Sequence, residues 1–288
     1  MRRWKPPCWS AKAKRDIERG MTALTNILLV GGGRMGSALL AGWREQGLSA
    51  AIVVDPSDAA QSLAGPGVTV VASVDEIAEG FVPEAVVLAV KPQNAGAALP
   101  AYARFAGHAV FISIMAGKTV AGIGGVLGGS AAIVRAMPNT PAAVRQGVTV
   151  AFAGEGVSQA QGDLADRLLG ATGAVAWVDD EGLLDAVTAI SGGGPAYVFL
   201  LTELMEQAAL AQGLPADLAK LMARQTVIGS ALLMAASSET PEALRVAVTS
   251  PGGTTAEALR VLRADDAWPK TFSEAMQAAT ERSRALSG

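Results

Sequence analysis

The sequence predicts an α/β protein in which a doubly wound parallel sheet is followed by an all-helical domain. Two observations carry this prediction. Short apolar runs alternate with helical stretches over the first 180 residues or so, and beyond about Asp180 the strand-like runs stop and alanine- and leucine-rich helical stretches take over. Alternation of this kind is typical of a parallel sheet covered on both faces by helices. We expect the sheet domain over residues 21–180 and the helical domain over residues 181–288.

Seven apolar runs are predicted to form the strands. The first is followed by a glycine-rich turn and then by residues 35–46, where small and apolar residues recur at helical spacing. Strands buried on both faces are apolar throughout and do not alternate with polar residues. The predicted strands are residues 26–30, 51–54, 68–71, 85–90, 109–114, 131–137 and 147–153.

Composition narrows the class of protein. The chain has 288 residues, half of them hydrophobic, a formal net charge of -3, one histidine and one cysteine. No basic run indicates a nucleic-acid partner, and no Cys/His cluster has the spacing of a metal site. No apolar block reaches the 18 or so residues of a membrane span. Cys8, the single cysteine, cannot form an intramolecular disulfide, so we expect a cytoplasmic protein. From the lack of a Cys/His cluster and of a long apolar block we expect neither a metal nor a membrane partner.

Residues 1–20 are charged and contain two adjacent prolines. They lack the apolar stretch of about seven residues that a secretory signal needs, and we expect a disordered extension. Met21 stands just before the first predicted strand, so a start-site error is an equally good explanation of this segment.

The predicted helix over residues 191–212 is hydrophobic nearly all round. A helix without a polar face is expected to be buried. A helical domain of this size has little else to cover it with, which favours a subunit interface over the core of a monomer.

The glycine-rich turn has the sequence G-G-G-R-M-G and fits the G-x-G-x-x-G pattern, directly after a strand and before a helix. Gly31 permits the tight turn, Gly33 lets a pyrophosphate approach the backbone, and Gly36 lets the helix pack on the strand. Arg34 and Met35 open the helix, whose dipole faces the phosphates. The pattern predicts a Rossmann-type dinucleotide site.

Asp55 ends the second predicted strand, 19 residues after Gly36, where a carboxylate can bind the adenosine ribose. A carboxylate there repels the 2'-phosphate of NADPH unless a cation offsets it, and residues 55–58 contain none. NADH is therefore favoured. NADPH stays open, because Ser57 could bind a phosphate.

Two loops follow strands at the carboxyl edge of the predicted sheet, where ligands of such folds bind. Val90, Lys91 and Pro92 stand at the end of the fourth strand, where Lys91 could contact cofactor or substrate, and a solvated Lys91 is the alternative. Asn139 and Thr140 follow the sixth strand and stand between two prolines, which stiffen the turn. We expect these loops to contact the cofactor, although an ordinary proline turn remains the alternative for the second.

Two further segments begin helices with glycines and free backbone N–H groups. Residues 191–197 (SGGGPAY) place a proline in the first helical turn, and their N–H groups can face an anion or the nicotinamide. Residues 250–255 (SPGGTT) join two helices, and their donors and the helix dipole suit a small carboxylate.

These motifs occur in the same order as in pyrroline-5-carboxylate reductases, and the chain resembles that family from about residue 26 to its C-terminus. The motifs are GGGRMG, VKPQ, MPNTP, SGGGPAY and VTSPGGTT, of which the last is the most specific. Two positions depart from the family. Gly193 stands where a serine is common, near the expected nicotinamide site, and Val246 stands where an acidic residue is common.

The resemblance implies reduction of 1-pyrroline-5-carboxylate to L-proline, the last step of proline biosynthesis, by hydride transfer from NADH or NADPH. It implies that the Thr255 hydroxyl binds the ring nitrogen as the catalytic group. It also implies a homodimer, with a ring of dimers left open, in which helical domains interlock. The implied ligands of the substrate carboxylate are Ser250, Gly252, Gly253, Thr254 and Thr255; Gly193 is an implied cofactor contact.

Two alternative functions remain open. A β-hydroxyacid dehydrogenase would share the layout but rely on a lysine of the helical domain, for which Lys220 is the candidate. A dinucleotide-binding sensor without turnover would keep the glycine motif but would not need residues 250–255. The one histidine, His108, is expected to be structural or solvated.

Overall fold

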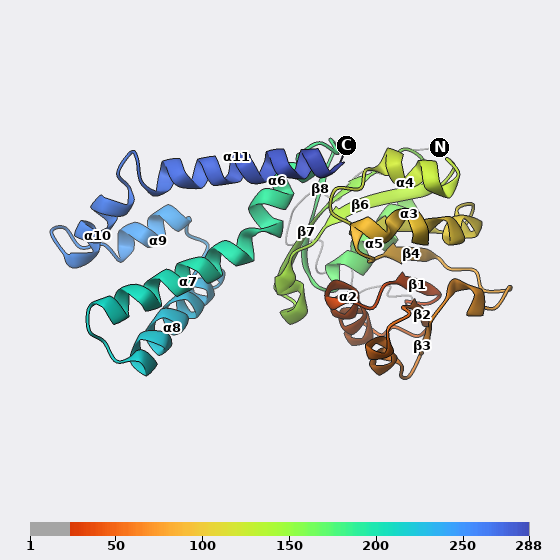
Figure 1. The fold of residues 1–288 in the computed structure, drawn as a ribbon, viewed down its shortest axis with the longest axis horizontal. Helices are drawn as coiled ribbons and strands as arrows, with labels where there is room; N and C mark the ends of the chain where they lie inside the picture. Colours follow the sequence, from red (N-terminus) through yellow and green to blue (C-terminus); the bar gives the residue numbers. More distant parts are fainter. Residues whose placement is uncertain (1–23, 288) are drawn as a thin grey trace. The chain divides into compact units, whose positions relative to one another are not determined.

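The computed structural model describes residues 24–287 (Figure 1). Within these residues the chain forms two compact units. The first runs up to Gly192 and also takes in the segment from Thr280 onward, and the second covers Gly193–Ala279. The expected extension over residues 1–20, with Cys8, and the alternative start at Met21 lie outside the described residues.

The first unit contains one eight-stranded sheet in the order β3-β2-β1-β4-β5-β6-β7-β8. Neighbouring strands from β1 to β6 all pair in parallel, and β1 lies between β2 and β4 in the register Val53–Leu29–Val87. This is the strand order of a doubly wound sheet, so the predicted fold class is confirmed. The strands are β1 Ile27–Val30, β2 Ala51–Val54, β3 Val68–Val71, β4 Ala85–Leu88, β5 Val110–Ser113, β6 Ala132–Met137, β7 Gly147–Ala153 and β8 Gly173–Val178.

The last two strands differ from the sequence prediction. β7 pairs with β6 in antiparallel fashion, because the connection over residues 138–146 is shorter than the dozen residues that a parallel crossover needs. β8 was not among the predicted strands. It lies at the edge of the sheet, pairs in parallel with β7 and is only half-buried, although its residues 174–178 are all apolar.

Helices cover both faces of the sheet (Figure 1). On one face, α2 Arg34–Glu45 and α5 Gln159–Gly170 pack against strand residues such as Leu29 and Val53. On the other, residues of α4 Val120–Leu127 and of the neighbourhood of α3 Ala95–Ala98 enclose the alternate strand residues. The core of the first unit thus has two halves, separated by the sheet.

A short segment connects the sheet to the second unit. It comprises α6 Leu183–Val187 and a π-helical turn over Thr188–Gly192, and it leads directly into α7 Gly194–Ala211. The second unit contains α7, α8 Ala216–Ala235, α9 Pro241–Ala247, α10 Thr254–Leu262 and the first part of α11 Trp268–Ser287.

Helix α7 has no buried residue in this chain, and Phe199 is 68% exposed. The helical stretch Leu183–Ala211 is long and apolar enough to cross a membrane by length and composition, and 17% of its most apolar window is buried. A helix of this composition is expected to be covered in the functional protein.

Gly42 in α2 gives a test of the packing of this helix. A Cβ there would overlap the carbonyl oxygen of Ala171, next to Trp43, whose indole N–H donates to Leu168 O at 2.8 Å. Replacing an interior helical glycine by alanine usually stabilises by about 0.5–1 kcal/mol. Overpacking costs about 1–3 kcal/mol. We predict that Gly42→Ala lowers the free energy of unfolding, measured by urea denaturation.

The matched control is Gly125→Ala in α4. An added Cβ at Gly125 has no neighbouring atom within 4 Å, so this substitution should raise the free energy of unfolding by about 0.5–1 kcal/mol. Equal effects of the two substitutions would contradict the close approach of α2 to the turn at Ala171.

Candidate functional site

The glycine-rich turn between β1 and α2 is held by close backbone contacts. Gly31 has a φ of 100°, and a Cβ there would lie 2.7 Å from Ala89 O. A Cβ at Gly36 would overlap the carbonyl oxygen of Gly31. Gly33, by contrast, has no atom within 4 Å of its Cβ position. Gly31 and Gly36 are therefore required for the fold of the turn, whereas Gly33 leaves open space above the backbone.

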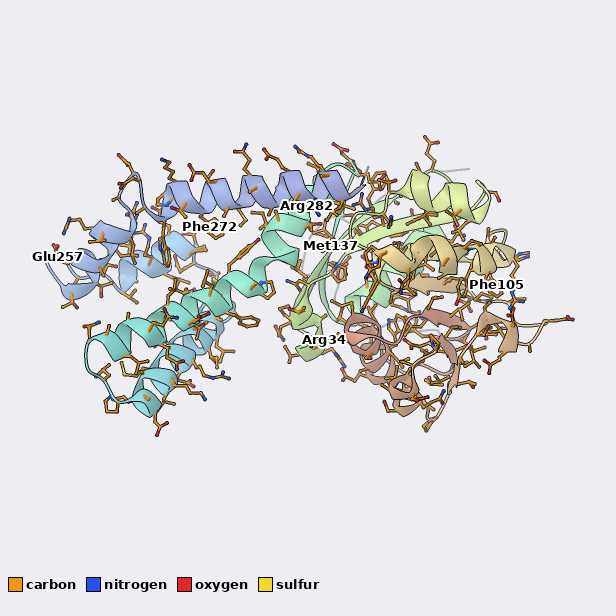
Figure 2. All side chains as sticks on the ribbon, in the orientation of Figure 1. Arg34, Phe105, Met137, Glu257, Phe272 and Arg282 are labelled. Carbon is orange, nitrogen blue, oxygen red and sulfur yellow. The ribbon has the colours of Figure 1, made fainter. Side chains whose placement is uncertain are left out.

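The start of α2 is suited to an anion. Gly33 is its N-cap and provides no side-chain cap, and no acidic residue lies in the first turn. The first N–H groups and the positive end of the helix dipole are thus available. Ser37, which the sequence analysis missed, donates to Gly32 O at 2.7 Å and to Gly33 O at 2.9 Å and so fixes the turn. Arg34, labelled in Figure 2, is exposed at the start of the helix.

Asp55 lies against the glycine-rich turn, as its place at the end of β2 predicts. Its Oδ2 accepts the Gly32 N–H at 2.6 Å, and its Oδ1 accepts from Ser57 N at 2.9 Å and Ser57 Oγ at 2.6 Å. Burial alone would raise the pKa of Asp55, but the hydrogen bonds from Ser57 and Gly32 outweigh it and the pKa is lowered. The site therefore holds a fixed negative charge.

The loop after β4 lies beside the same turn. Ala89 N donates to Val30 O at 2.8 Å, and Ala89 O lies where a Cβ on Gly31 would meet it. Val90, Lys91 and Pro92 follow at once, with Lys91 exposed as the N-cap of a short helix over Pro92–Asn94. The structure thus gathers this loop, the glycine-rich turn and Asp55 at the carboxyl ends of β1, β2 and β4.

Asn139 lies at the carboxyl end of β6. Its Oδ1 accepts Val148 N at 2.9 Å, and its Nδ2 donates to Ser191 Oγ at 3.3 Å. Close by, a Cβ at Gly192 would lie 2.6 Å from Met137 Cε. Both ends of the Asn139 amide therefore have partners within the protein, which the sequence did not indicate. Figure 2 marks Met137 in this region.

The predicted substrate loop belongs to the second unit. Gly252 has a φ of 70°, Gly253 N donates to Ser250 O at 3.0 Å, and Gly253 is the N-cap of α10 without a side-chain cap. Thr254 and Thr255 open the helix and are exposed. The loop thus brings all the predicted substrate ligands together and offers free N–H groups.

Three further expectations concern other side chains. His108 is exposed in a turn before β5, and Lys220 is exposed on α8. Among residues 24–287, no group of three or more His, Cys, Asp or Glu side chains could hold a metal ion.

Comparison with known proteins identifies the family. Residues 181–286 match the family described as pyrroline-5-carboxylate reductase dimerisation, and residues 26–117 match the family described as NADP oxidoreductase, coenzyme F420-dependent. A pyrroline-5-carboxylate reductase from Pseudomonas aeruginosa is 38% identical over 263 residues, which cover 90% of this chain and 96% of that protein. The chain belongs to the pyrroline-5-carboxylate reductase family. The resemblance drawn from its motifs is confirmed.

Other members of the family agree in sequence and in fold. A pyrroline-5-carboxylate reductase from Synechocystis is 38% identical, over 90% of this chain and 97% of its own. The solved structure of the reductase from Coxiella burnetii matches with a TM-score of 0.83 at 34% identity, over 91% of this chain and 98% of its own. The Plasmodium falciparum pyrroline carboxylate reductase, solved with NADP bound, matches with a TM-score of 0.79 at 29% identity, over 93% and 100%.

The family match and the compact units divide the chain at different points. The dimerisation match begins at residue 181, whereas the second unit begins at Gly193. Residues 181–192 thus belong to the dimerisation region by sequence and to the sheet unit by their contacts.

Gly36 allows the glycine-rich turn to fold, whereas Gly33 is proposed to leave room for a phosphate, and substitution can test the two roles separately. We predict that Gly36→Ala lowers the free energy of unfolding by about 1–3 kcal/mol, because the added Cβ overlaps the carbonyl oxygen of Gly31. Gly33→Ala should change that free energy by less than about 1 kcal/mol, since it alters only an N-cap. Both should weaken dinucleotide binding, measured by NADH fluorescence titration. Wild-type affinity in folded Gly33→Ala protein would show that no phosphate approaches this backbone.

Proposed function

We propose that this chain is a pyrroline-5-carboxylate reductase that transfers a hydride from a nicotinamide dinucleotide to the C=N bond of 1-pyrroline-5-carboxylate and so forms L-proline. The observation that carries the proposal is the loop over residues 250–255, which opens α10 with free N–H groups and no side-chain cap in a member of this family. A sensor would need only the glycine-rich turn.

The residues at the carboxyl edge of the sheet fit a dinucleotide. The N–H groups at Gly33, Arg34, Met35 and Gly36 would bind the pyrophosphate, because the space above Gly33 is open and the helix dipole favours an anion. Asp55 would accept from the adenosine ribose. Val90, Lys91, Pro92, Asn139 and Gly193 are proposed to line the nicotinamide half. When bound, the cofactor supplies the hydride.

The second unit is proposed to hold the substrate. The backbone around Gly252, Gly253 and Thr254, with Ser250, would bind the carboxylate of the imine acid at the positive end of α10 through N–H groups other than that of Gly253, which donates to Ser250 O. The Thr255 hydroxyl would hydrogen-bond the ring nitrogen and orient the C=N bond. A threonine is a poor acid at neutral pH, so the imine takes its proton from solution and Thr255 acts by positioning.

Asp55 supports a preference for NADH. Its lowered pKa keeps the carboxylate ionised, and an ionised carboxylate beside the ribose repels a 2'-phosphate. The alternative role of Ser57 as a phosphate ligand would require its hydroxyl to leave Asp55, to which it now donates at 2.6 Å.

A homodimer is proposed as the functional unit, with residues 181–288 as its dimerisation and substrate domain. The exposed apolar surface of α7 supports this, together with a groove between α7 and α8 that Phe199, Val227 and Ile228 help to line. Lys220 lines the same groove, which favours an interface role over the catalytic lysine of a β-hydroxyacid dehydrogenase. A ring of dimers and a cytoplasmic location complete the proposal.

The test is oxidation of NADH or NADPH on addition of 1-pyrroline-5-carboxylate to the purified protein, followed by absorbance. The wild type should oxidise the cofactor rapidly. Thr255→Ala should lower kcat/KM by roughly 100-fold, as expected for loss of a positioning contact, while the Kd for NADH stays unchanged. No oxidation by a wild type that binds NADH would exclude the reductase, and unchanged turnover in the variant would remove Thr255 from the site.

Asp55 can be tested with the same assay. We predict that Asp55→Ser shifts the ratio of kcat/KM values toward NADPH by about tenfold or more, since about 1.4 kcal/mol of relieved repulsion is a factor of ten. The control is Asp58→Ser, which removes an equal charge from an exposed side chain in the same segment. If both variants shift the ratio equally, the effect comes from net charge and not from the position of Asp55.

A further inference from the structure

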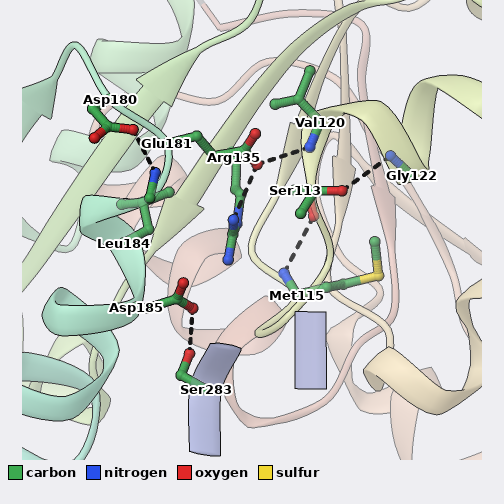
Figure 3. A network of polar contacts seen from close by, with 12 residues as sticks. Ser113, Met115, Val120, Gly122, Arg135, Asp180, Glu181, Leu184, Asp185 and Ser283 are labelled. Atoms are coloured by element: carbon green, nitrogen blue, oxygen red, sulfur yellow. Dashed lines mark hydrogen bonds and ion pairs between the residues drawn. The ribbon is translucent and has the colours of Figure 1, made fainter. Parts of the chain in front are cut away.

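The connecting strap, residues 181–192, is fixed within the first unit by polar contacts to the middle of the chain and to the end of α11. Glu181 accepts from Arg135 Nη1 at 3.0 Å and from Val120 N at 2.8 Å, and the Arg135 side chain is 5% exposed. Asp185 accepts from Ser283 Oγ at 2.6 Å, near the end of α11. Figure 3 shows both sets of contacts. They hold the α6 part of the strap.

A third contact holds the π-helical turn at the other end of the strap. Asn139 Nδ2 donates to Ser191 Oγ at 3.3 Å. The orientation of the Asn139 amide is fixed, because Val148 N can only donate and must therefore face Oδ1, at 2.9 Å. The nitrogen end of the amide then faces Ser191, so the amide spans from β7 to the turn.

The loop that carries Asn139 is also attached to the helix that begins at the glycine-rich turn. Arg145, at the end of this loop, donates to both carboxylate oxygens of Glu45 on α2 at 2.8 and 2.9 Å and to Ala38 O at 3.4 Å. Through Asn139, one loop therefore joins the proposed cofactor helix to the turn of the strap.

The turn lies on the half of the sheet where the nicotinamide is expected. In a doubly wound sheet the two mononucleotide halves bind at the carboxyl ends of β1–β3 and β4–β6, and the glycine-rich turn and Asp55 occupy the first half. Asn139 directly follows Met137 and Pro138 at the end of β6. Turns of π-helix, such as Thr188–Gly192, are frequent at functional sites.

We propose that Asn139 and Ser191 are positioning residues for hydride transfer. Their hydrogen bond holds the π-helical turn, which ends at Gly192, at the carboxyl end of β6, on the nicotinamide half of the proposed cofactor site. Gly192 has no side chain of its own to fix the end of that turn, so the Asn139–Ser191 hydrogen bond adds a side-chain restraint to the helical hydrogen bonds of the backbone. The inference rests on the proposed reductase function.

The test is Ser191→Ala, which removes the acceptor of the Asn139 Nδ2–H. We expect kcat with 1-pyrroline-5-carboxylate to fall by roughly tenfold to 100-fold, as for a misplacement near 1 Å, with the Kd for NADH unchanged within about twofold. The primary isotope effect with C4-deuterated NADH should rise, because hydride transfer becomes slower than product release. Ser191→Thr, which keeps a hydroxyl, should restore most of kcat.

Ser283→Ala is the matched control, since it removes a hydroxyl of α11 that donates to the same strap at Asp185 in α6, and not at the π-helical turn. It should lower the melting temperature but leave kcat and the isotope effect as in the wild type. Wild-type kcat and isotope effect in Ser191→Ala, or a fall equal to that of Ser283→Ala, would overturn the inference. Absence of turnover in the wild type would instead refute the proposed function.

Discussion

The close approach of backbone to backbone at the glycine-rich turn is the constraint on which the sheet unit and its site depend. Gly36 must lack a side chain for α2 to begin above Gly31, and Gly31 must turn with a positive φ to pass Ala89. Because α2 begins there, its first N–H groups face outward, and Gly32 can donate to Asp55. The loop after β4 lies beside the turn for the same reason. One steric requirement thus places the proposed phosphate donors, the proposed ribose acceptor and the neighbouring loop together.

Much of this arrangement was predictable from the sequence. Five of the first six strands are almost wholly buried and mostly apolar, which is why they could be found, and the glycine pattern fixed the position of α2. β3 is only partly buried and could be found from its valines. The direction of β7 follows from the short connection before it. An apolar run predicts a strand but not its direction, so the run alone did not indicate the antiparallel pairing. β8 was missed although its residues 174–178 form an apolar run like those of the other strands. The π-helical turn could not be found, because it lies within a continuous helical pattern.

The partners of the site residues were harder to predict than the residues themselves. The glycines, Asp55 and Asn139 stand in recognisable motifs. By contrast, Ser37, Ser57 and Ser191 each contribute a hydroxyl whose partner no motif indicates. Ser57 lies two residues from Asp55 and could have been found as a local turn. Ser191 lies 52 residues from Asn139, and only the pairing of β6 with β7 and the course of the strap bring the two together.

The strap also explains how one chain can serve an interface and a catalytic site at once. Its residues match the dimerisation family, yet the side chains of Glu181, Asp185 and Ser191 bond to the sheet strands and loops and to the end of α11. The π-helical turn at its end runs directly into α7, whose apolar side chains are exposed in a single chain. If a second copy covers α7, as we propose, the dimer restrains the helix that follows the turn, and Asn139 restrains the turn itself at Ser191. The turn between them is then fixed by two independent sets of contacts, which is the condition for holding a reacting group in place without a titrating side chain.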